Sequence, residues 1–357
     1  MPVSSGLREG RGRDSLRAAL RPPVPRVSVV VVTWNGRPLL ERFLPSVLAT
    51  DYPDVEIVVA DNASTDGTAG WLARAHPTVR VVRHATNRLF AGGNNAAVPH
   101  TTGALVCFLN NDVEVPPDWL GPLVAAFADP GVVAVQPTLL QHADRGLFEY
   151  AGAAGGFLDR DGIPFTRGRL FDTLEPDAGQ YDDARDVFWA TGAALVVRRD
   201  AFLAAAGFDE AFGMHMEEID LCWRLARAGG RIRAEPASRV YHLGGASLPR
   251  GARKTYLNYR NGLAMLVKNL PDPHAGRVLR RRVVLDAAAV ARLAASGQRD
   301  EAAAILRAWR DFRRWAPGLP RPAPGERLVL PSYRGSVVAD YFARGRRRFS
   351  DLSGGWL

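Results

Sequence analysis

The stretch VCFLNND at residues 106–112 joins an apolar run to three polar side chains. This pattern is typical of a buried strand that delivers polar residues to a sheet edge. In open α/β sheets, ligands bind outside the carboxyl ends of the strands, so Asn110, Asn111 and Asp112 are candidates for an active site. For an isolated triplet, a polar turn after a core strand is the simpler interpretation, and only the rest of the chain can decide between the two.

The same pattern of an apolar run followed by polar residues recurs upstream of this stretch. The predicted strands are 27–33, 55–60, 79–82 and the strand beginning at Val106, and the helices that follow the first two are 38–49 and 68–75. Strands that alternate with helices predict a mainly parallel sheet, in which polar strand ends meet in one crevice.

Two acidic residues and a pair of glycines stand out in the loops after these strands. Asp61 and Asp66 both have an ordinary explanation as turn or N-cap residues, but Asp61 directly follows an apolar strand. Asp61 is therefore the better candidate for a base or ribose contact. Gly92 and Gly93 permit close backbone approach, but they form no GxGxxG motif and so give no support to nicotinamide binding.

The middle of the chain changes character. Helical spacing at 116–130 and a strand at 132–135 continue the alternation. Residues 141–186 are rich in Gly, Asp and aromatic side chains and predict hairpins and loops beside the sheet, a natural acceptor-binding region. A strand over 188–197 and a helix over 200–206 follow.

A second cluster of reactive side chains lies in MHMEEIDLCWRLARAGG, residues 214–230. The spacing predicts a helix with three acids in its first turn, where acids complement the helix dipole. An i,i+4 ion pair with Arg224 accounts for Asp220. Helix capping does not require two further acids, so Glu217 and Glu218 need another explanation. The positive helix end is expected to keep a carboxylate ionised for use as a general base.

The C-terminal part of the chain is strongly basic. His242 follows a predicted β-segment and precedes two glycines, although a lone histidine is more often structural. Residues 275–297 and 299–315 predict two basic amphipathic helices, which either pack as an appendage or attach the protein to a membrane surface. From residue 316 the chain is rich in Pro and Arg, and we expect less order there.

The overall composition of the 357-residue chain is that of a globular protein, with 47% hydrophobic and 23% charged residues and a net charge of +9. Cys107 and Cys222 lie in apolar patterns, which predicts buried free thiols in a reducing compartment. The first residues contain no apolar segment of the signal-peptide kind, and no run reaches the roughly 18 apolar residues of a membrane span.

Taken in order, several segments and His242 resemble the motif set of the family-2 inverting glycosyltransferases, most nearly the bacterial rhamnosyltransferase-like and galactofuranosyltransferase-like members. The segments are 29–35, 61–67, 87–95, 109–112, 207–210 and 217–224. The set is specific, whereas any single motif is weak. The resemblance implies an α/β GT-A fold, with a mainly parallel mixed sheet flanked by helices, a sugar-nucleotide donor, and Mg²⁺ or Mn²⁺.

The resemblance also implies roles for particular residues. It assigns donor binding to Thr33, Asn35, Asp61, Asn87, Gly93, Asn110 and Asn111. Asp112 and His242 would bind the metal, Glu218 would be the catalytic base, and Glu217 would contact the sugar. Two departures from the family pattern matter: Asn110 replaces the first acid of an Asp-X-Asp triplet, and Glu218 stands where the family more often has Asp.

We therefore expect three regions: a mobile arm at 1–25, a GT-A domain at 26–268, and a basic helical region with a Pro/Arg-rich tail at 269–357. The expected activity moves a sugar, rhamnose-like sugars included, from a UDP- or dTDP-linked donor to a saccharide or lipid-linked glycan acceptor in cell-surface polysaccharide synthesis. The expected location is the cytoplasm, with peripheral contact to the inner face of the membrane left open.

Three other functions are weaker alternatives. A catalytically silent sugar-nucleotide-binding protein of the same fold would be favoured by loss of Glu217 and Glu218, and both are present. A pyrophosphorylase should have a Gly- and Arg-rich phosphate loop after the first strand, which TWNG at 33–36 is not. A nucleic-acid binder predicts salt-sensitive binding by residues 276–357, and we do not expect nucleic acid as a partner.

Overall fold

The computed structural model describes residues 24–244, 251–323 and 326–356. Most of the predicted arm, residues 1–23, therefore lies outside the described residues. Within them, the main sheet has nine strands in the order β11-β13-β6-β12-β4-β1-β2-β3, with β5 paired to β13. The bounds are β1 Val27–Thr33, β2 Val55–Asp61, β3 Arg80–Arg83, β4 Leu105–Asn110, β5 Val113–Glu114, β6 Val132–Gln141, β11 Arg185–Val187, β12 Ala194–Arg198 and β13 Arg231–His242.

The sheet is mixed, and its N-terminal half is parallel. Strand β1 pairs in parallel with β2 and β4, and β2 pairs in parallel with β3. Strand β12 then runs antiparallel between β4 and β6. The parallel half follows from the strand–helix alternation, because a crossover helix returns the chain to the same sheet edge before each new strand.

Helices cover both faces of this sheet, as the apolar side chains of β1 require. Val29 and Val31 pack in one cluster with Leu40 and Leu44 of α2, whereas Val30 packs in the other cluster with Ala91 of α4. The helices that flank the sheet are α2 Arg37–Leu48, α3 Thr68–Ala75, α4 Leu89–Ala97, α5 Leu120–Ala125, α6 Arg199–Ala204 and α7 Glu217–Arg227. A strand buried on both faces explains the unbroken valine run.

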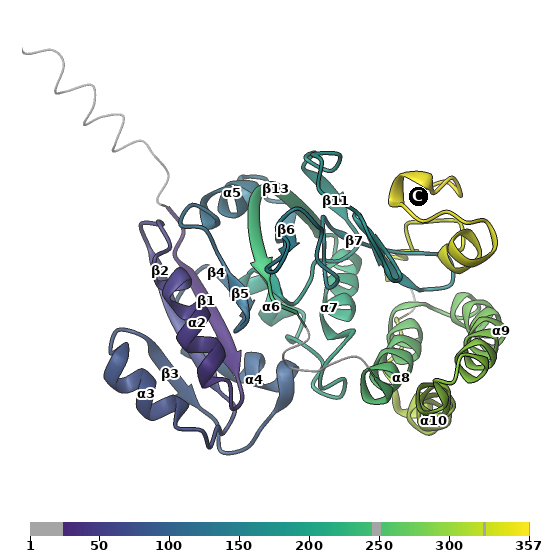
Figure 1. Cartoon of the computed structure of the whole chain (residues 1–357), viewed down its shortest axis with the longest axis horizontal. Helices are drawn as coiled ribbons and strands as arrows, with labels where there is room; N and C mark the ends of the chain where they lie inside the picture. Colours follow the sequence, from purple (N-terminus) through teal and green to yellow (C-terminus); the bar gives the residue numbers. More distant parts are fainter. Residues whose placement is uncertain (1–23, 245–250, 324–325, 357) are drawn as a thin grey trace, which may run out of the picture.

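Beside the main sheet lies a smaller antiparallel one, in the region expected to hold hairpins. Its strands are β7 Gly156–Leu158, β8 Pro164–Thr166, β9 Arg169–Leu170 and β10 Thr173–Leu174. Three helices complete the fold: α8 Ala252–Asn269, α9 His274–Ala295 and α10 Arg299–Trp315. These helices gather on the side of the molecule away from α3 and β3 (Figure 1). No helix of the described residues is long and apolar enough to cross a bilayer.

The tail after residue 316 is more ordered than we expected. Tyr333 is fully buried and donates a 2.6 Å hydrogen bond to Asp340, and Phe349 and Leu352 are also buried. Trp356 packs edge-on against Phe157 of the small sheet, with ring centroids 5.2 Å apart. The expectation was wrong because the Pro and Arg content of the tail obscured widely spaced aromatic residues that pack beside β7. The tail lies next to β7 in Figure 1.

Several element boundaries also differ from the sequence-based expectation; the strand predicted over 188–197, for example, is confined to β12 Ala194–Arg198. Helix α4 begins at Leu89, so Gly92 and Gly93 lie within a helix rather than in a strand-end loop. A Cβ on Gly93 would lie 2.8 Å from Val32 Cγ2, which shows that the glycine permits close helix–sheet packing. Strand β13 is continuous from Arg231 to His242, with a bulge between Glu235 and Arg239.

Candidate active site

The register of the parallel strands places the predicted polar residues at one edge of the sheet. Thr33 lies opposite Asp61 on β2, and Asn110 of β4 lies opposite Val32. The loop after β4 then returns beside β1, where Asn111 Nδ2 donates a 2.9 Å hydrogen bond to Thr33 Oγ1. The expected crevice at the carboxyl ends of these strands is therefore present.

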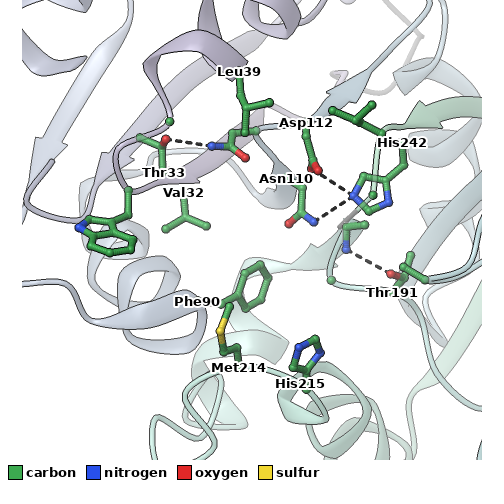
Figure 2. Close-up of a pocket in the computed structure, with 18 of the residues that line it drawn as sticks. Val32, Thr33, Leu39, Phe90, Asn110, Asp112, Thr191, Met214, His215 and His242 are labelled. Atoms are coloured by element: carbon green, nitrogen blue, oxygen red, sulfur yellow. Dashed lines mark hydrogen bonds and ion pairs between the residues drawn. The ribbon is translucent and has the colours of Figure 1, made fainter. Parts of the chain in front are cut away.

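A second strand pairing brings His242 to this crevice. Strand β5 pairs with the end of β13, so that Val113 lies opposite His242. His242 Nε2 consequently lies 3.1 Å from Asp112 Oδ1 and 3.4 Å from Asn110 Nδ2 (Figure 2). Residues about 130 positions apart in sequence form this corner of the site.

Glu149 lies beside the other ring nitrogen of His242. Its Oε2 lies 3.3 Å from His242 Nδ1, and both side chains are buried. Burial lowers the pKa of His242, but hydrogen bonds and charge from Asp112 and Glu149 outweigh it and raise the pKa to about 10. Sequence reasoning missed Glu149, because nothing in its local pattern distinguishes it from other acids of the 141–186 region.

The corner formed by Asn110, Asp112 and His242 offers oxygen and nitrogen ligands for a divalent cation, which would have to displace the proton that the raised pKa of His242 keeps on its ring. Neighbouring ligands on an octahedral ion with bonds of about 2.1 Å are about 3 Å apart, which is close to the Asp112–His242 spacing. Asn110 would add its side-chain carbonyl oxygen as a ligand if its side-chain amide were rotated by 180°. The described residues contain no group of three or more His, Cys, Asp or Glu side chains arranged to bind a metal, so further ligands would come from the donor.

The loops after β1 and β2 are tied together beside this corner. Asn35 Oδ1 accepts a 2.7 Å hydrogen bond from the Thr65 amide, and the Asn35 amide donates to Ser64 Oγ at 2.9 Å. Asn87 Oδ1 accepts from the Leu89 amide at 2.8 Å and thereby orders the start of α4. Asn35 and Asn87 both line the cleft.

Two of the predicted donor-binding residues do not reach the wall of the cleft. Asp61 is fully buried, and its Oδ1 accepts a 2.9 Å hydrogen bond from the Ser64 amide. Its Oδ2 lies 3.8 Å from Arg83 Nε and has no hydrogen-bond partner in the described part of the chain. Gly93 lies within α4 and packs against β1. Both residues therefore pack behind the residues that line the cleft. Strand register and periodicity alone could not show that these two residues face away from it.

The opposite side of the cleft contains the first turn of α7. Glu217 and Glu218 both line the cleft, and each has a buried carboxylate oxygen without a hydrogen-bond partner among the described residues. Burial and the neighbouring Glu218 raise the pKa of Glu217 well above its ordinary value. Burial also raises the pKa of Glu218 to about 7, although backbone N–H groups of Met216, Glu218 and Ile219 act in the other direction.

These pKa shifts correct one expectation. The helix end was expected to keep a carboxylate ionised, but desolvation outweighs the helix N–H groups and raises the pKa of both Glu217 and Glu218. The proposed ion pair of Asp220 with Arg224 is present, with Arg224 Nε 2.8 Å from Asp220 Oδ2. Lys268 Nζ of α8 also lies 2.9 Å from that oxygen, so Asp220 links α7 to α8 through this ion pair.

Together these walls enclose a cleft of about 750 Å³. Beyond the predicted residues it is lined by Trp34, Glu149, His215, Arg253 and Lys254, among others. Trp34 is 57% exposed, although it directly follows a core strand. Phe90 and Met214 lie across the cleft from Asn110 (Figure 2). Exposure of a tryptophan is a signal of binding, but exposure cannot be read from the sequence.

Comparisons with known proteins agree with this architecture. A family model described as Glycosyl transferase family 2 matches residues 28–175. An N-acetylglucosaminyl-diphospho-decaprenol L-rhamnosyltransferase of Mycobacterium tuberculosis is 33% identical over 243 residues, which are 60% of this chain and 75% of that protein.

Two solved structures share the fold. A mannosyltransferase from Pyrobaculum calidifontis, in complex with GDP-mannose and Mn²⁺, superposes with a TM-score of 0.51 at 21% identity, over 85% of this chain and 89% of that one. GalNAc-T7, solved with UDP, GalNAc and Mn²⁺, superposes with a TM-score of 0.55 at 19% identity, over 71% of this chain and 49% of that one.

Proposed function

The chain belongs to glycosyl transferase family 2 and has the GT-A fold, and on that premise we propose that it is an inverting enzyme of cell-surface polysaccharide synthesis. The proposed donor is a UDP- or dTDP-linked sugar, with a rhamnose-like sugar as the first choice. The proposed acceptor is a hydroxyl of a saccharide or of a lipid-linked glycan. The Mycobacterium tuberculosis relative, an N-acetylglucosaminyl-diphospho-decaprenol L-rhamnosyltransferase, supports the choice of a rhamnose-like sugar and of a lipid-linked acceptor.

One observation carries the proposal. A single cleft is lined on one side by Asp112 and His242, and on the other by Glu217 and Glu218. Transfer needs both sides, because negative charge develops on the departing diphosphate while a proton leaves the attacking hydroxyl. Another pocket of the described residues, lined by Tyr52 and Leu105, contains neither a histidine nor a glutamate.

Glu218 is the proposed general base. With a pKa of about 7, its carboxylate is substantially ionised at neutral pH and still basic enough to accept a proton from the acceptor hydroxyl. As that oxygen attacks the anomeric carbon, the bond to the nucleoside diphosphate breaks, and displacement from the opposite face inverts the centre. Burial and the neighbouring Glu218 raise the pKa of Glu217 well above its ordinary value, so its neutral carboxyl would donate a hydrogen bond to a sugar hydroxyl.

The donor would occupy the side of the cleft formed by β1, α4 and β4. Trp34 offers an exposed ring against which a nucleobase could stack, and Thr33, Asn35, Asn87 and Asn111 offer hydrogen bonds. The proposed role of Asp61 is then to order the loop at Ser64.

Asp112 and His242, with Asn110 beside them, would hold Mg²⁺ or Mn²⁺, and the cation would stabilise the charge of the departing diphosphate. Glu149 would orient His242 from the far side, as second carboxylates commonly do for metal-bound imidazoles. Arg253 and Lys254 line the same cleft and would add positive charge near the phosphates.

A donor screen tests this proposal. The full chain is incubated with dTDP-rhamnose, UDP-galactose, UDP-N-acetylglucosamine or GDP-mannose and candidate acceptors, with and without EDTA, and nucleoside diphosphate release is measured. We expect release with one dTDP- or UDP-sugar and its loss in EDTA. Glu218→Gln should lower kcat at least 100-fold while the donor Kd changes less than about three-fold. Unchanged turnover in that variant would remove Glu218 as the base.

The proposed location is the cytoplasmic face of the membrane, with contact through the basic helices α9 and α10. The exposed surface of α10 includes Arg307, Arg310, Arg313 and Arg314, which suits an anionic lipid surface. The proposed division remains one GT-A domain at 26–268 followed by a helical region at 269–357.

A further inference from the structure

Asn261 of α8 contacts the loop that leads into α7. Its side chain is fully buried. Its amide Nδ2 lies 3.0 Å from the Phe212 carbonyl oxygen, 3.0 Å from that of Met214 and 2.8 Å from that of His215. One side chain therefore supplies the donor for three backbone acceptors of a five-residue loop, and its two protons are shared among them.

The partners of Asn261 determine which end of its amide faces the loop. Carbonyl oxygens only accept hydrogen bonds, so the NH₂ group must point toward them. On the other side, Arg260 Nε donates to Asn261 Oδ1 at 2.9 Å, and a guanidinium only donates. A reversed amide would place like groups against each other on both sides, so only asparagine in this orientation satisfies all four partners.

The loop that Asn261 holds has an unfavourable backbone conformation. His215 has a φ of 68° and Met216 a φ of 74°, a region that residues with a Cβ disfavour. Two such residues in succession persist only where surrounding contacts impose them. Met216 immediately precedes α7, and no side chain of the described residues caps that helix start. The turn at His215–Met216 therefore sets the direction in which α7 begins.

We propose that Asn261 is a positioning residue for catalysis: its amide holds the left-handed turn at His215–Met216 and thereby directs Glu217 and Glu218 into the cleft. The proposal rests on the proposed role of Glu218 as base. Without the amide, the Met214 and His215 carbonyls lose this donor, whereas the Phe212 carbonyl still accepts from the Met214 amide. The turn can then relax toward ordinary backbone conformations. The first turn of α7 then rotates, and the two carboxylates move relative to Asp112 and His242.

Asn269 provides a matched control on the same helix. It is also an asparagine, it is 1% exposed, and its Nδ2 donates to Asp220 Oδ1 and to the Met265 carbonyl. Replacing it loosens the contact between α8 and α7 without removing a partner of the 212–216 loop. Asn261→Leu and Asn269→Leu thus remove the same group from the same helix, but only the first should release the turn.

The first measurement needs no substrate. Amide hydrogen exchange, followed by mass spectrometry on the full chain, should be at least ten-fold faster over residues 211–219 in Asn261→Leu than in the wild type, and unchanged there in Asn269→Leu. Asn261→Asp keeps the size of the side chain but removes the donors, so it should behave like Asn261→Leu. Wild-type exchange in both Asn261 variants would overturn the proposal.

The second measurement uses turnover with dTDP-rhamnose, or with whichever donor is active in the screen. Asn261→Asp and Asn261→Leu should lower kcat about 10- to 100-fold with donor KM within three-fold, because small displacements of reacting groups are costly. Asn269→Leu should retain kcat within three-fold. Equal losses in the two asparagine positions would overturn the proposal, since they would indicate general loosening.

Glu218→Gln is measured in parallel to separate the two proposals. If Glu218→Gln is inactive and the Asn261 variants turn over normally, the positioning role fails and the base assignment stands. If Glu218→Gln retains full turnover, the base assignment fails. In that case, faster exchange at 211–219 still decides whether Asn261 holds the turn.

Discussion

At the scale of single residues, the environment of Glu218 determines the expected pH dependence. Its pKa is raised by burial to about 7, and a base must be ionised to accept a proton. We therefore expect kcat to rise with pH through about 7 and to level off above it. Because Glu217 and Glu218 lie together, the observed value belongs to the pair. A profile that is flat from pH 5 to pH 8 would contradict the assignment.

The same carboxylate should destabilise the fold at high pH. A group whose pKa is higher in the folded than in the unfolded state contributes stability below its unfolded pKa, and that stability is lost as pH rises through the folded value. For Glu218 this window runs from 4.5, its ordinary value, to about 7. Glu218→Gln should thus raise the free energy of unfolding by about 2–3 kcal/mol at pH 8 and much less at pH 4.5, by denaturant titration. An equal gain in the free energy of unfolding at pH 4.5 and at pH 8 would contradict an origin in the raised pKa of Glu218.

Asn110 should limit the affinity for metal. It leaves Asp112 as the sole carboxylate of the 110–112 triplet, and affinity for hard cations rises with the number of charged ligands. We expect the free protein to bind Mn²⁺ weakly and the sugar nucleotide to tighten that binding. Asn110→Asp should strengthen Mn²⁺ binding by the free protein about ten-fold, measured by calorimetry. The control is Asp112→Asn, which should abolish it; equal affinity in wild type and Asn110→Asp would contradict the prediction.

At the scale of elements, α4 packs against β1 through Gly93. A Cβ there would lie 2.6 Å from Asn62 Nδ2 and 2.8 Å from Val32 Cγ2. Gly93→Ala should therefore cost about 1–3 kcal/mol of stability, because overpacking forces the helix away from the sheet. Gly121→Ala is the control: a Cβ added there would meet no neighbouring atom of the described residues within 4 Å, so the change should be neutral or slightly stabilising. Equal effects of the two substitutions would contradict this packing.

The order of the elements was predictable because apolar periodicity is local. Strand β1 and helices α3 and α10 have the predicted bounds, and α2 and α9 differ from the predicted ones by one to two residues. The start of α4 was placed wrongly, because Asn87, which accepts from the Leu89 amide just before the helix, is a residue type that fits a loop as well as a helix start. The tail from 316 was placed wrongly because its aromatic residues are too far apart to show a period.

At the scale of the whole molecule, the tail is part of the core. Trp223 of α7 is fully buried, and its Nε1 donates a 3.0 Å hydrogen bond to the Val329 carbonyl. The Val337 amide donates to buried Asp159 beside β7. Deletion of residues 327–357 should thus lower the Tm by at least 10 °C, or give insoluble protein, through lost burial. Arg334→Ala, at an exposed site of the tail, should change stability by less than about 0.5 kcal/mol. A deleted chain that melts like the wild type would contradict this role.

The basic helices give a second prediction at this scale. Arg313 and Arg314 are exposed on α10, and each basic residue near an anionic surface contributes about 1 kcal/mol. Replacing both by Gln should weaken binding of the full chain to phosphatidylglycerol vesicles about ten- to thirty-fold, in co-sedimentation at low salt. The same replacement of Arg74 and Arg80, on α3 and β3, is the matched control. Binding that is equal with phosphatidylcholine vesicles would remove the electrostatic explanation.

The sequence by itself determined the alternating elements, the family resemblance, and the polar residues at the strand ends, because each of these depends on neighbours along the chain. Only the tertiary structure decided which of these residues meet. The pairing of β5 with β13 brings His242 to Asp112, burial raises the pKa of Glu217 and Glu218 against the expected effect of the helix end, and Asn261 reaches a loop about 46 residues away. These features arise from contacts between distant segments, and desolvation depends on everything that surrounds a group, so no local pattern encodes them.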